Sequence, residues 1–166
     1  MPDTTDRLAL PLLATGQAQK EATHNEALAR ADMLIQPVVQ SVAAASVPTS
    51  PQIGQCWIVG SGATGAWAGH DAAIACWTGG GWRFADSFPG MCAWNIATAS
   101  FALRGASSWS IGISNASQYR VNDMQVVGAR QSAIPNPLSG TVVDAESRVA
   151  LSAVLAALRA HGLIAP

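Results

Sequence analysis

The chain has 166 residues, of which 49% are hydrophobic and 11% charged, with a formal net charge of −1. The hydrophobic fraction supports a packed core and excludes wholesale disorder, while the missing basic surface excludes phosphate-dominated binding to nucleic acid. Because an average domain is about 25% charged, this surface must be wetted by neutral polar groups or covered by other subunits.

No targeting or membrane segment is predicted. Met1 to Asp6 is polar and acidic, unlike the basic start of a signal peptide. The stretch from Met33 to Gly69 has no charged residue, but prolines and glutamines interrupt it. A membrane span needs about 20 mostly apolar residues. We therefore expect no membrane insertion and favour an assembly over a free monomer.

The first predicted element is a helix over residues 17–36, where good helix formers dominate and no proline precedes Pro37. Thr15 is its expected N-cap, and Glu26 and Arg30 form a favourable i,i+4 pair. The apolar stripe is weak at first and stronger toward the end of the helix. Its interface candidates are Leu28, Leu34 and Ile35.

An extended arm or strand is predicted over residues 38–47, closed by a proline turn at 48–51. Short β-type runs separated by glycines follow: Gln55–Val59, Ala73–Thr78, Trp82–Ala85, Met91–Ile96, Phe101–Leu103 and Ser108–Ile113. The clearest hairpin places Gly79–Gly81 between two of these runs, since glycines supply the positive φ of tight turns. Residues 115–123 are predicted as a polar connection and 124–127 as a possible last strand.

A proline-containing linker over residues 130–140 leads to the closing helix. Asp144 is its predicted N-cap, and Gly162 ends it with Leu163 folding back. Its apolar stripe consists of Leu151, Val154, Leu155 and Leu158, and three of these are interface candidates: Leu151, Leu155 and Leu158. The stripe can pack on its own domain or on a neighbouring subunit.

These elements predict an α+β fold, with a small antiparallel β meander or barrel flanked by the two helices. The expected segments are 1–50 (helix and arm), 51–128 (tryptophan-rich β domain) and 129–166 (linker and closing helix). Cys56, Cys76 and Cys92 lack metal-ligand spacing and are interpreted as small buried hydrophobic residues in or beside strands.

The residues offer little catalytic chemistry. His24, His70 and His161 lie in three separate segments, and no nucleophile elbow, phosphate loop, dinucleotide fingerprint or metal cluster is recognisable. Asp71 and Asp86 bracket the predicted hairpin and are the one carboxylate pair worth naming for glycoside hydrolysis. We interpret them as solvated loop residues and expect neither enzyme activity nor a cofactor or metal.

The six tryptophans all lie in the β-rich middle of the chain. Most are expected in the core, including Trp57 and Trp94, because large rings supply much of a small sheet's burial. Trp67 sits in a glycine-flanked loop where one chain buries a ring less easily. Exposed indoles stack on sugars or anchor interfaces, and the ligand-binding candidates are Trp67, Trp77 and Trp82.

The N-terminal sequence resembles the opening signature of an uncharacterised domain family. The signature consists of residues 16–21 (GQAQKE) and 24–28 (HNEAL), and the similarity continues through 54–59, 63–69, 74–77, 81–84 and 89–90. The tail, 143–148 through 158–164, is similar to closing segments of the same kind of particle protein. That family recurs in tail-fibre and spike-like proteins of bacteriophages, prophages and gene transfer agents. The resemblance implies no catalytic residues.

The resemblance implies a structural component of a phage-like particle of the gene-transfer-agent type. The expected protein is a homo-oligomeric spike or fibre base on the particle exterior, made in the bacterial cytoplasm. It connects a capsid or tail protein to a receptor-binding fibre protein. The alternatives are a carbohydrate-binding module for host capsule or cell-wall polysaccharide and, more weakly, a wall-degrading enzyme using Asp71 and Asp86.

Overall fold

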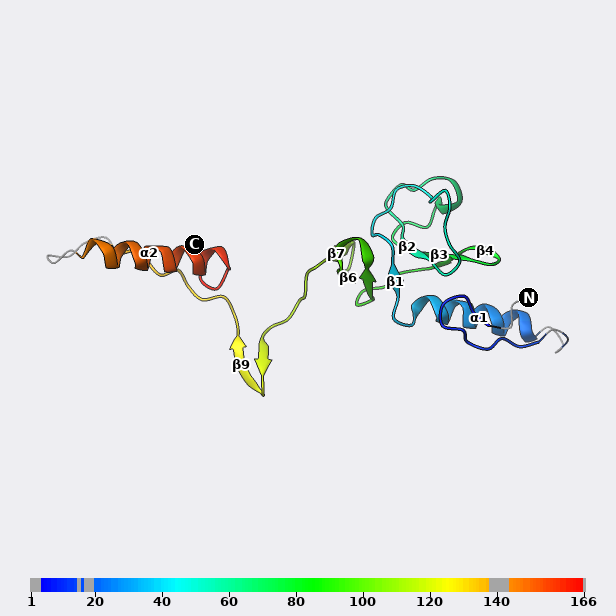
Figure 1. The fold of residues 1–166 in the computed structure, drawn as a ribbon, viewed down its shortest axis with the longest axis horizontal. Helices are drawn as coiled ribbons and strands as arrows, with labels where there is room; N and C mark the ends of the chain where they lie inside the picture. Colours follow the sequence, from blue (N-terminus) through cyan, green and yellow to red (C-terminus); the bar gives the residue numbers. More distant parts are fainter. Residues whose placement is uncertain (1–3, 15, 17–19, 138–143, 166) are drawn as a thin grey trace. The chain divides into compact units, whose positions relative to one another are not determined.

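The computed structural model describes residues 4–14, 16, 20–137 and 144–165. They belong to two compact units, Met1–Ser114 and Asn115–Pro166. The described residues combine two α-helices with small, mainly antiparallel sheets, and no described sheet closes into a barrel (Figure 1). The predicted α+β class is confirmed. The segments 1–50 and 51–128 are grouped differently, because the first lies in the same unit as most of the second.

Helix α1 (Lys20–Leu34) falls within the predicted range 17–36, whereas Thr15 and residues 17–19 lie outside the described residues. The helix ends before Pro37, which cannot continue it. Glu26 and Arg30 form the expected pair, with 3.6 Å between Oε1 and Nε. The buried residues of α1 are Asp32 and Met33, and neither was among the interface candidates of this helix.

Asp32 holds the N-terminal arm (residues 4–14) on α1. The residue is 3% exposed, and its carboxylate accepts hydrogen bonds from Thr5 Oγ1 (2.9 Å), Arg7 N (2.9 Å) and Leu8 N (2.7 Å). The Arg7 guanidinium donates to backbone carbonyls at the C-terminal end of α1, where the helix dipole favours a cation. These polar contacts join the arm to the end of the helix, while Met33 packs into the apolar core.

The first sheet has the order β2-β3-β4 and is antiparallel, with β2 at Cys56–Ile58, β3 at Ile74–Thr78 and β4 at Gly81–Ala85. The predicted hairpin is confirmed: Trp77 pairs with Trp82 and Thr78 with Gly81, which leaves Gly79 and Gly80 as the turn. The loop between β2 and β3 contains the short helix η1 (Gly65–Trp67).

The second sheet has the order β1-β5-β6-β7. Its strands are β1 (Val38–Val39), β5 (Cys92–Asn95), β6 (Ser100–Arg104) and β7 (Trp109–Ile111), and the turn between β5 and β6 contains η2 (Ile96–Thr98). Strand β1 is parallel to β5, which the antiparallel prediction missed. The segment after β1 (residues 40–44) continues along β2, with Gln40 N 2.8 Å from Cys56 O and Ala44 N 3.0 Å from Ile58 O. This segment thus links the two sheets.

The core of the first unit lies on both sides of β2 and β3, whose successive side chains point to opposite faces. One face packs Cys56, Ile58, Ile74 and Cys76 into a cluster with Met33 and with residues of β1, β5 and β6. The other face packs Trp57, Val59 and Ala75 against Trp67 and Ala63. Two-sided burial explains why both strands are rich in apolar residues.

The second unit contains β8 (Tyr119–Val121), β9 (Met124–Val127) and α2 (Ala145–Ala160). The predicted polar connection at 115–123 is wrong, because Tyr119–Val121 pairs with β9. The turn residues Asn122 and Asp123 both have positive φ, the geometry of a tight hairpin turn.

The predicted ends of α2 are confirmed. Asp144 caps the helix by accepting a hydrogen bond from Ser147 N at 2.8 Å. At the other end Gly162 has φ +71°, and Leu163 N donates to Leu158 O at 3.0 Å, as in a Schellman cap. Neither described helix has the length and hydrophobicity that crossing a bilayer requires.

Candidate functional site

Three of the predicted site residues, Trp67, Trp77 and Trp82, meet on one face of the first sheet, together with Trp57. The ring centroids of Trp82 lie 5.2 Å from Trp67, 5.6 Å from Trp57 and 5.1 Å from Trp77, in edge-on geometry. Such geometry matches the quadrupoles of aromatic rings. Residues separated by loops therefore form one aromatic cluster, and Trp57 is in the core as predicted.

Trp67, a ligand-binding candidate because its glycine-flanked loop buries a ring less easily, lies in the core. Its side chain is fully buried, because η1 turns the loop back so that the ring packs under Trp57 and Trp82. Its Nε1 is buried without a hydrogen-bond partner in the described part of the chain. Trp67 is thus placed for packing and not for stacking on a ligand, while Trp77 and Trp82 are half-buried.

Trp94 was expected in the core, but the structure exposes it. Its side chain is 37% exposed and that of Phe101, directly opposite on β6, is 58% exposed. The two rings are 5.0 Å apart and edge-on. The alternation along β5 turns Ala93 and Asn95 inward, so Trp94 must point outward. Val38 pairs with Trp94 on the same face, which makes this an apolar surface.

Of the carboxylate pair considered for glycoside hydrolysis, Asp71 has a structural role in its loop. The Asp71 carboxylate accepts hydrogen bonds from Gly62 N (3.0 Å) and Ser61 Oγ (3.4 Å), which fixes the loop after β2. Asp86 is an exposed residue directly after β4. His70 is stacked on Phe84, with ring centroids 3.6 Å apart.

A cavity of about 590 Å³ lies between the N-terminal arm, α1 and the β3–β4 turn. Pockets for small molecules commonly have volumes of about 300–1,000 Å³. Carboxylates of Asp6, Glu21 and Asp32 belong to its wall, as do Cys76 and Arg83. One oxygen of Glu21 is buried and has no partner among the described residues. No motif or periodicity in the sequence indicates this cavity, because its walls come from three distant segments.

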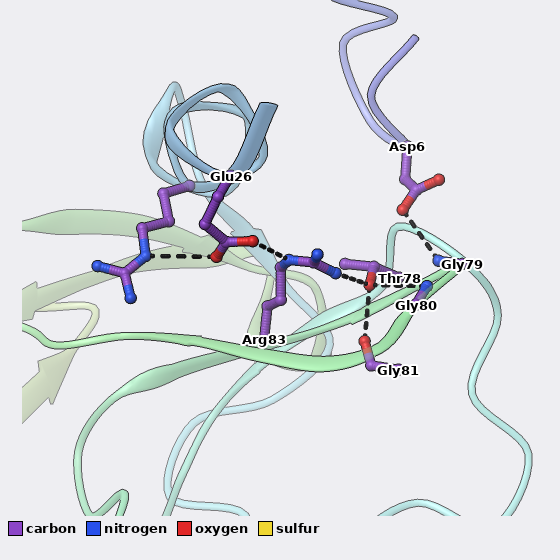
Figure 2. Close-up of polar contacts among 8 residues, drawn as sticks. Asp6, Glu26, Thr78, Gly79, Gly80, Gly81 and Arg83 are labelled. Atoms are coloured by element: carbon purple, nitrogen blue, oxygen red, sulfur yellow. Dashed lines mark hydrogen bonds and ion pairs between the residues drawn. The ribbon is translucent and has the colours of Figure 1, made fainter. Parts of the chain in front are cut away.

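Beside the cavity, a chain of polar contacts fixes the hairpin turn to α1 (Figure 2). Arg83 Nε donates to Glu26 Oε2 at 3.0 Å, and Arg83 Nη1 donates to Thr78 Oγ1 at 2.7 Å. The Thr78 hydroxyl in turn donates to Gly81 O and accepts from Gly80 N. In addition, Gly79 N donates a hydrogen bond to Asp6 Oδ2 of the N-terminal arm at 3.1 Å.

This arrangement orders a glycine turn that would otherwise be free to change conformation. It therefore sets the shape of the cavity wall. None of its residues was a predicted site residue. The available signal was Arg83 itself, a cation in a segment that is almost free of charge.

The interface candidates separate into buried and exposed residues. Leu34, Ile35 and Leu151 are exposed, at 37%, 48% and 48%. Leu28 and Leu158 are half-buried. Leu155 is 4% exposed, so it packs within its own unit, which is one of the two placements expected for this stripe.

The cysteines also differ from one another. Cys56 and Cys76 are buried within strands as expected, but the expectation of burial is wrong for Cys92, which is exposed on β5. All three are free thiols. Cys56 and Cys76 are opposite each other in the β2–β3 register.

The described part of the second unit has many exposed apolar side chains. Every residue of β8 and β9 is exposed, including Val121 at 58%, Met124 at 73% and Val126 at 58%. On α2, Val149 and Val154 are exposed as well. Contiguous apolar surface of this kind marks interaction sites more often than isolated residues do.

No curated protein matches the chain. A family model described as "Protein of unknown function (DUF2793)" matches residues 24–110. The matched range begins within α1, includes both sheets of the first unit up to β7, and excludes the N-terminal arm and the second unit. Since the match covers more than half of the 166 residues, the chain belongs to the DUF2793 family.

Proposed function

We propose that the protein is a structural component of a phage-like particle of the gene-transfer-agent type. In this proposal it is a homo-oligomeric spike or fibre base on the particle exterior. It joins a capsid or tail protein to a receptor-binding fibre protein and performs no catalytic step. The sequence resemblance to phage tail-fibre and spike-like proteins suggests the setting, and the uncovered second unit supports an assembly role.

The observation that carries the proposal is the exposure of the β8–β9 hairpin. A two-stranded hairpin is at best marginally stable in water, because it has too little surface to bury. Here its apolar side chains face outward, and the buried hydrophobic residues of the described part of this unit are Leu155 and Ile164. A partner that covers Val121, Met124 and Val126 would supply the missing burial.

Sister copies fit this surface. Residues 115–166 contain four arginines and three acidic residues, a difference of +1, so copies brought together repel one another weakly. The outer edges of β8 and β9 have no strand partner in their described sheet, and open edges accept strands from other chains. A closed ring of copies would use the same surface repeatedly.

Light scattering over a range of micromolar concentrations tests the assembly. We expect an oligomer for the wild type and a monomer for the double variant Val121→Lys, Met124→Lys, whose positions are paired in the hairpin. The matched control is Gln125→Lys on the same strand. A wild-type monomer at every concentration, or an unchanged oligomer in the double variant, would contradict the proposal.

Imaging tests the particle setting. Labelled protein is expected on the exterior of native particles, and the monomeric variant is expected to be missing from them. An oligomer that never joins particles would retain the assembly role and overturn the particle role.

The exposed Trp94–Phe101 pair favours a second candidate, recognition of host capsule or cell-wall polysaccharide. Flat, uncharged rings on a sheet face are suited to stacking on sugars. Calorimetric titration with host polysaccharide would then show binding that Trp94→Ala abolishes. Phe88→Ala is the control, because Phe88 is also exposed, at 59%, but lies outside this pair. Equal loss in both variants, or no binding by the wild type, would remove the candidate.

A further inference from the structure

Two thiols face each other in the most buried part of the first unit. Cys56 on β2 is paired with Cys76 on β3, and both strands are antiparallel. The side chains are 0% and 1% exposed, and both belong to the cluster that contains Met33, Ile58 and Ile74. Neither thiol takes part in the polar contacts around Arg83 or in the aromatic cluster, although Cys76 belongs to the cavity wall.

The position of the pair in the ladder suits a covalent bond. Backbone hydrogen bonds connect the neighbouring pairs, with Trp77 N 2.9 Å from Gln55 O and Val59 N 2.9 Å from Ala73 O. Bonded and non-bonded pairs alternate in an antiparallel ladder, so Cys56 and Cys76 form a non-hydrogen-bonded pair. Cα atoms of such pairs are about 4.5 Å apart, within the range of about 4.4–6.8 Å that disulfides span.

The surroundings prepare one of the thiols for reaction. A hydrogen bond from Cys76 lowers the pKa of Cys56, while the same bond, together with burial, raises the pKa of Cys76. Burial raises the pKa at both positions, and of the nearby charges the Arg7 guanidinium lowers it while the Asp32 carboxylate raises it. Cys76, but not Cys56, belongs to the wall of the 590 Å³ cavity. Since Cys56 is 0% exposed, a small disulfide reaches its sulfur when the strands open locally.

We propose that Cys56 and Cys76 are a site of reversible cross-linking, oxidised by disulfides of low molecular weight to a bond that fixes β2 to β3. In the first step, the Cys56 thiolate attacks one sulfur of the small disulfide, and one small thiolate leaves. In the second step, Cys76 loses its proton and attacks the Cys56 sulfur, and the second small thiolate leaves.

The exchange balances without another reactant. The two protein thiols lose two protons and two electrons, and the small disulfide becomes two small thiols. Since the two residues are already opposite each other in the ladder, the bond forms without a change of register. It closes the loop that carries η1 and Trp67 and restricts the unfolded chain.

The test uses the full-length Cys92→Ser variant in glutathione redox buffers, because Cys92 is exposed and would add its own reactions. We expect the intact mass to fall by two hydrogen atoms and the two remaining thiols to resist alkylation. Peptide mapping is expected to join the peptides of residues 56 and 76. The oxidised form should melt about 5–10 °C higher than the reduced form.

Two controls separate cross-linking from other oxidation. Cys56→Ser and Cys76→Ser, each combined with Cys92→Ser, are expected to take up one glutathione or to remain reduced, and to show no rise in melting temperature. Refolding from denaturant in the same buffers gives the oxidant access to both sulfurs. A native-like protein that still has two free thiols after oxidative refolding would overturn the proposal, as would a stable glutathione adduct of the intact pair.

Discussion

Residues 56–59 and 73–76 of the first unit are buried without interruption, whereas all residues of β8 and β9 in the second unit are exposed. The first unit fills both faces of its central strands from its own chain. The second has a well-capped helix and a tight hairpin but little to bury them against. Local signals are thus sufficient to form elements, while a core requires segments that are distant in sequence. The family match ends at residue 110, before the weakly buried unit begins.

Removing the fully buried ring of the aromatic cluster, Trp67, is expected to have the largest effect. Trp67→Ala should lower the free energy of unfolding of the first unit by about 3–5 kcal/mol, because it leaves a cavity under Trp57 and Trp82. Trp94→Ala is the matched control, since its ring is partly exposed, and should cost much less. Denaturant unfolding measures both. Similar losses would contradict the difference between core and surface rings.

A buried and an exposed leucine of α2, Leu155 and Leu151, extend the comparison to the second unit. Leu155→Ala should destabilise that unit by about 2–4 kcal/mol, because Leu155 is 4% exposed. Leu151→Ala should stay within about 0.5 kcal/mol in dilute, monomeric protein. If sister copies cover Leu151, its cost rises with protein concentration. Helix melting followed by circular dichroism at two concentrations measures this, and a concentration-independent cost for Leu151→Ala would argue against coverage.

Substituting Asp32 tests how much its hydrogen bonds to the N-terminal arm stabilise the first unit. Asp32→Asn retains the size of the side chain but turns an amide donor toward the donors that the carboxylate now binds. We expect a loss of about 1–3 kcal/mol, the usual cost of a buried unsatisfied group. Asp86→Asn, at an exposed position, should change the free energy of unfolding by less than about 0.5 kcal/mol. Equal effects in urea titrations would show that the arm is held by other contacts.

Features that depend on local signals were predictable from the sequence, and features that depend on long-range packing were not. The β3–β4 hairpin and the caps at Asp144 and Gly162 were predictable, because glycines and capping side chains act over a few residues. The exposure of Trp94 was not predictable, because alternation defines two faces of β5 without saying which one is covered. Strand β8 had a signal that was missed: Asn122-Asp123 is suited to a tight turn with positive φ.

The candidate site was less predictable than the fold. The burial of Trp67 depends on η1 folding back over β2, and Asp32 depends on an arm some 25 residues earlier in the chain. The cavity beside Arg83 likewise needs three segments in place. Each of these features is a long-range contact, and periodicity in one segment carries no information about it.

The Glu26–Arg83 pair is expected to contribute a smaller amount. A double-mutant cycle with Glu26→Gln and Arg83→Met should give a coupling free energy of about 0.5–1 kcal/mol, since both side chains are partly exposed and screened by solvent. The coupling should decrease in high salt. The Glu26–Arg30 pair is longer and more exposed, so its cycle should give less. A larger value for Arg30 would contradict the assignment of Arg83 as the link to the hairpin.

The smallest expected effect is a pH response at the start of α2. Hydrogen bonds from the backbone and side chain of Ser147 lower the pKa of Asp144. A lowered pKa in the folded state means that the ionised cap stabilises the helix above the ordinary pKa of about 3.8. This stabilisation is lost as the pH falls through the lower, folded-state pKa. Amide exchange at Ser147 should therefore accelerate in that range beyond its intrinsic rate. Asp144→Asn keeps a capping oxygen that does not titrate, and an unchanged acid response in that variant would exclude Asp144 as its source.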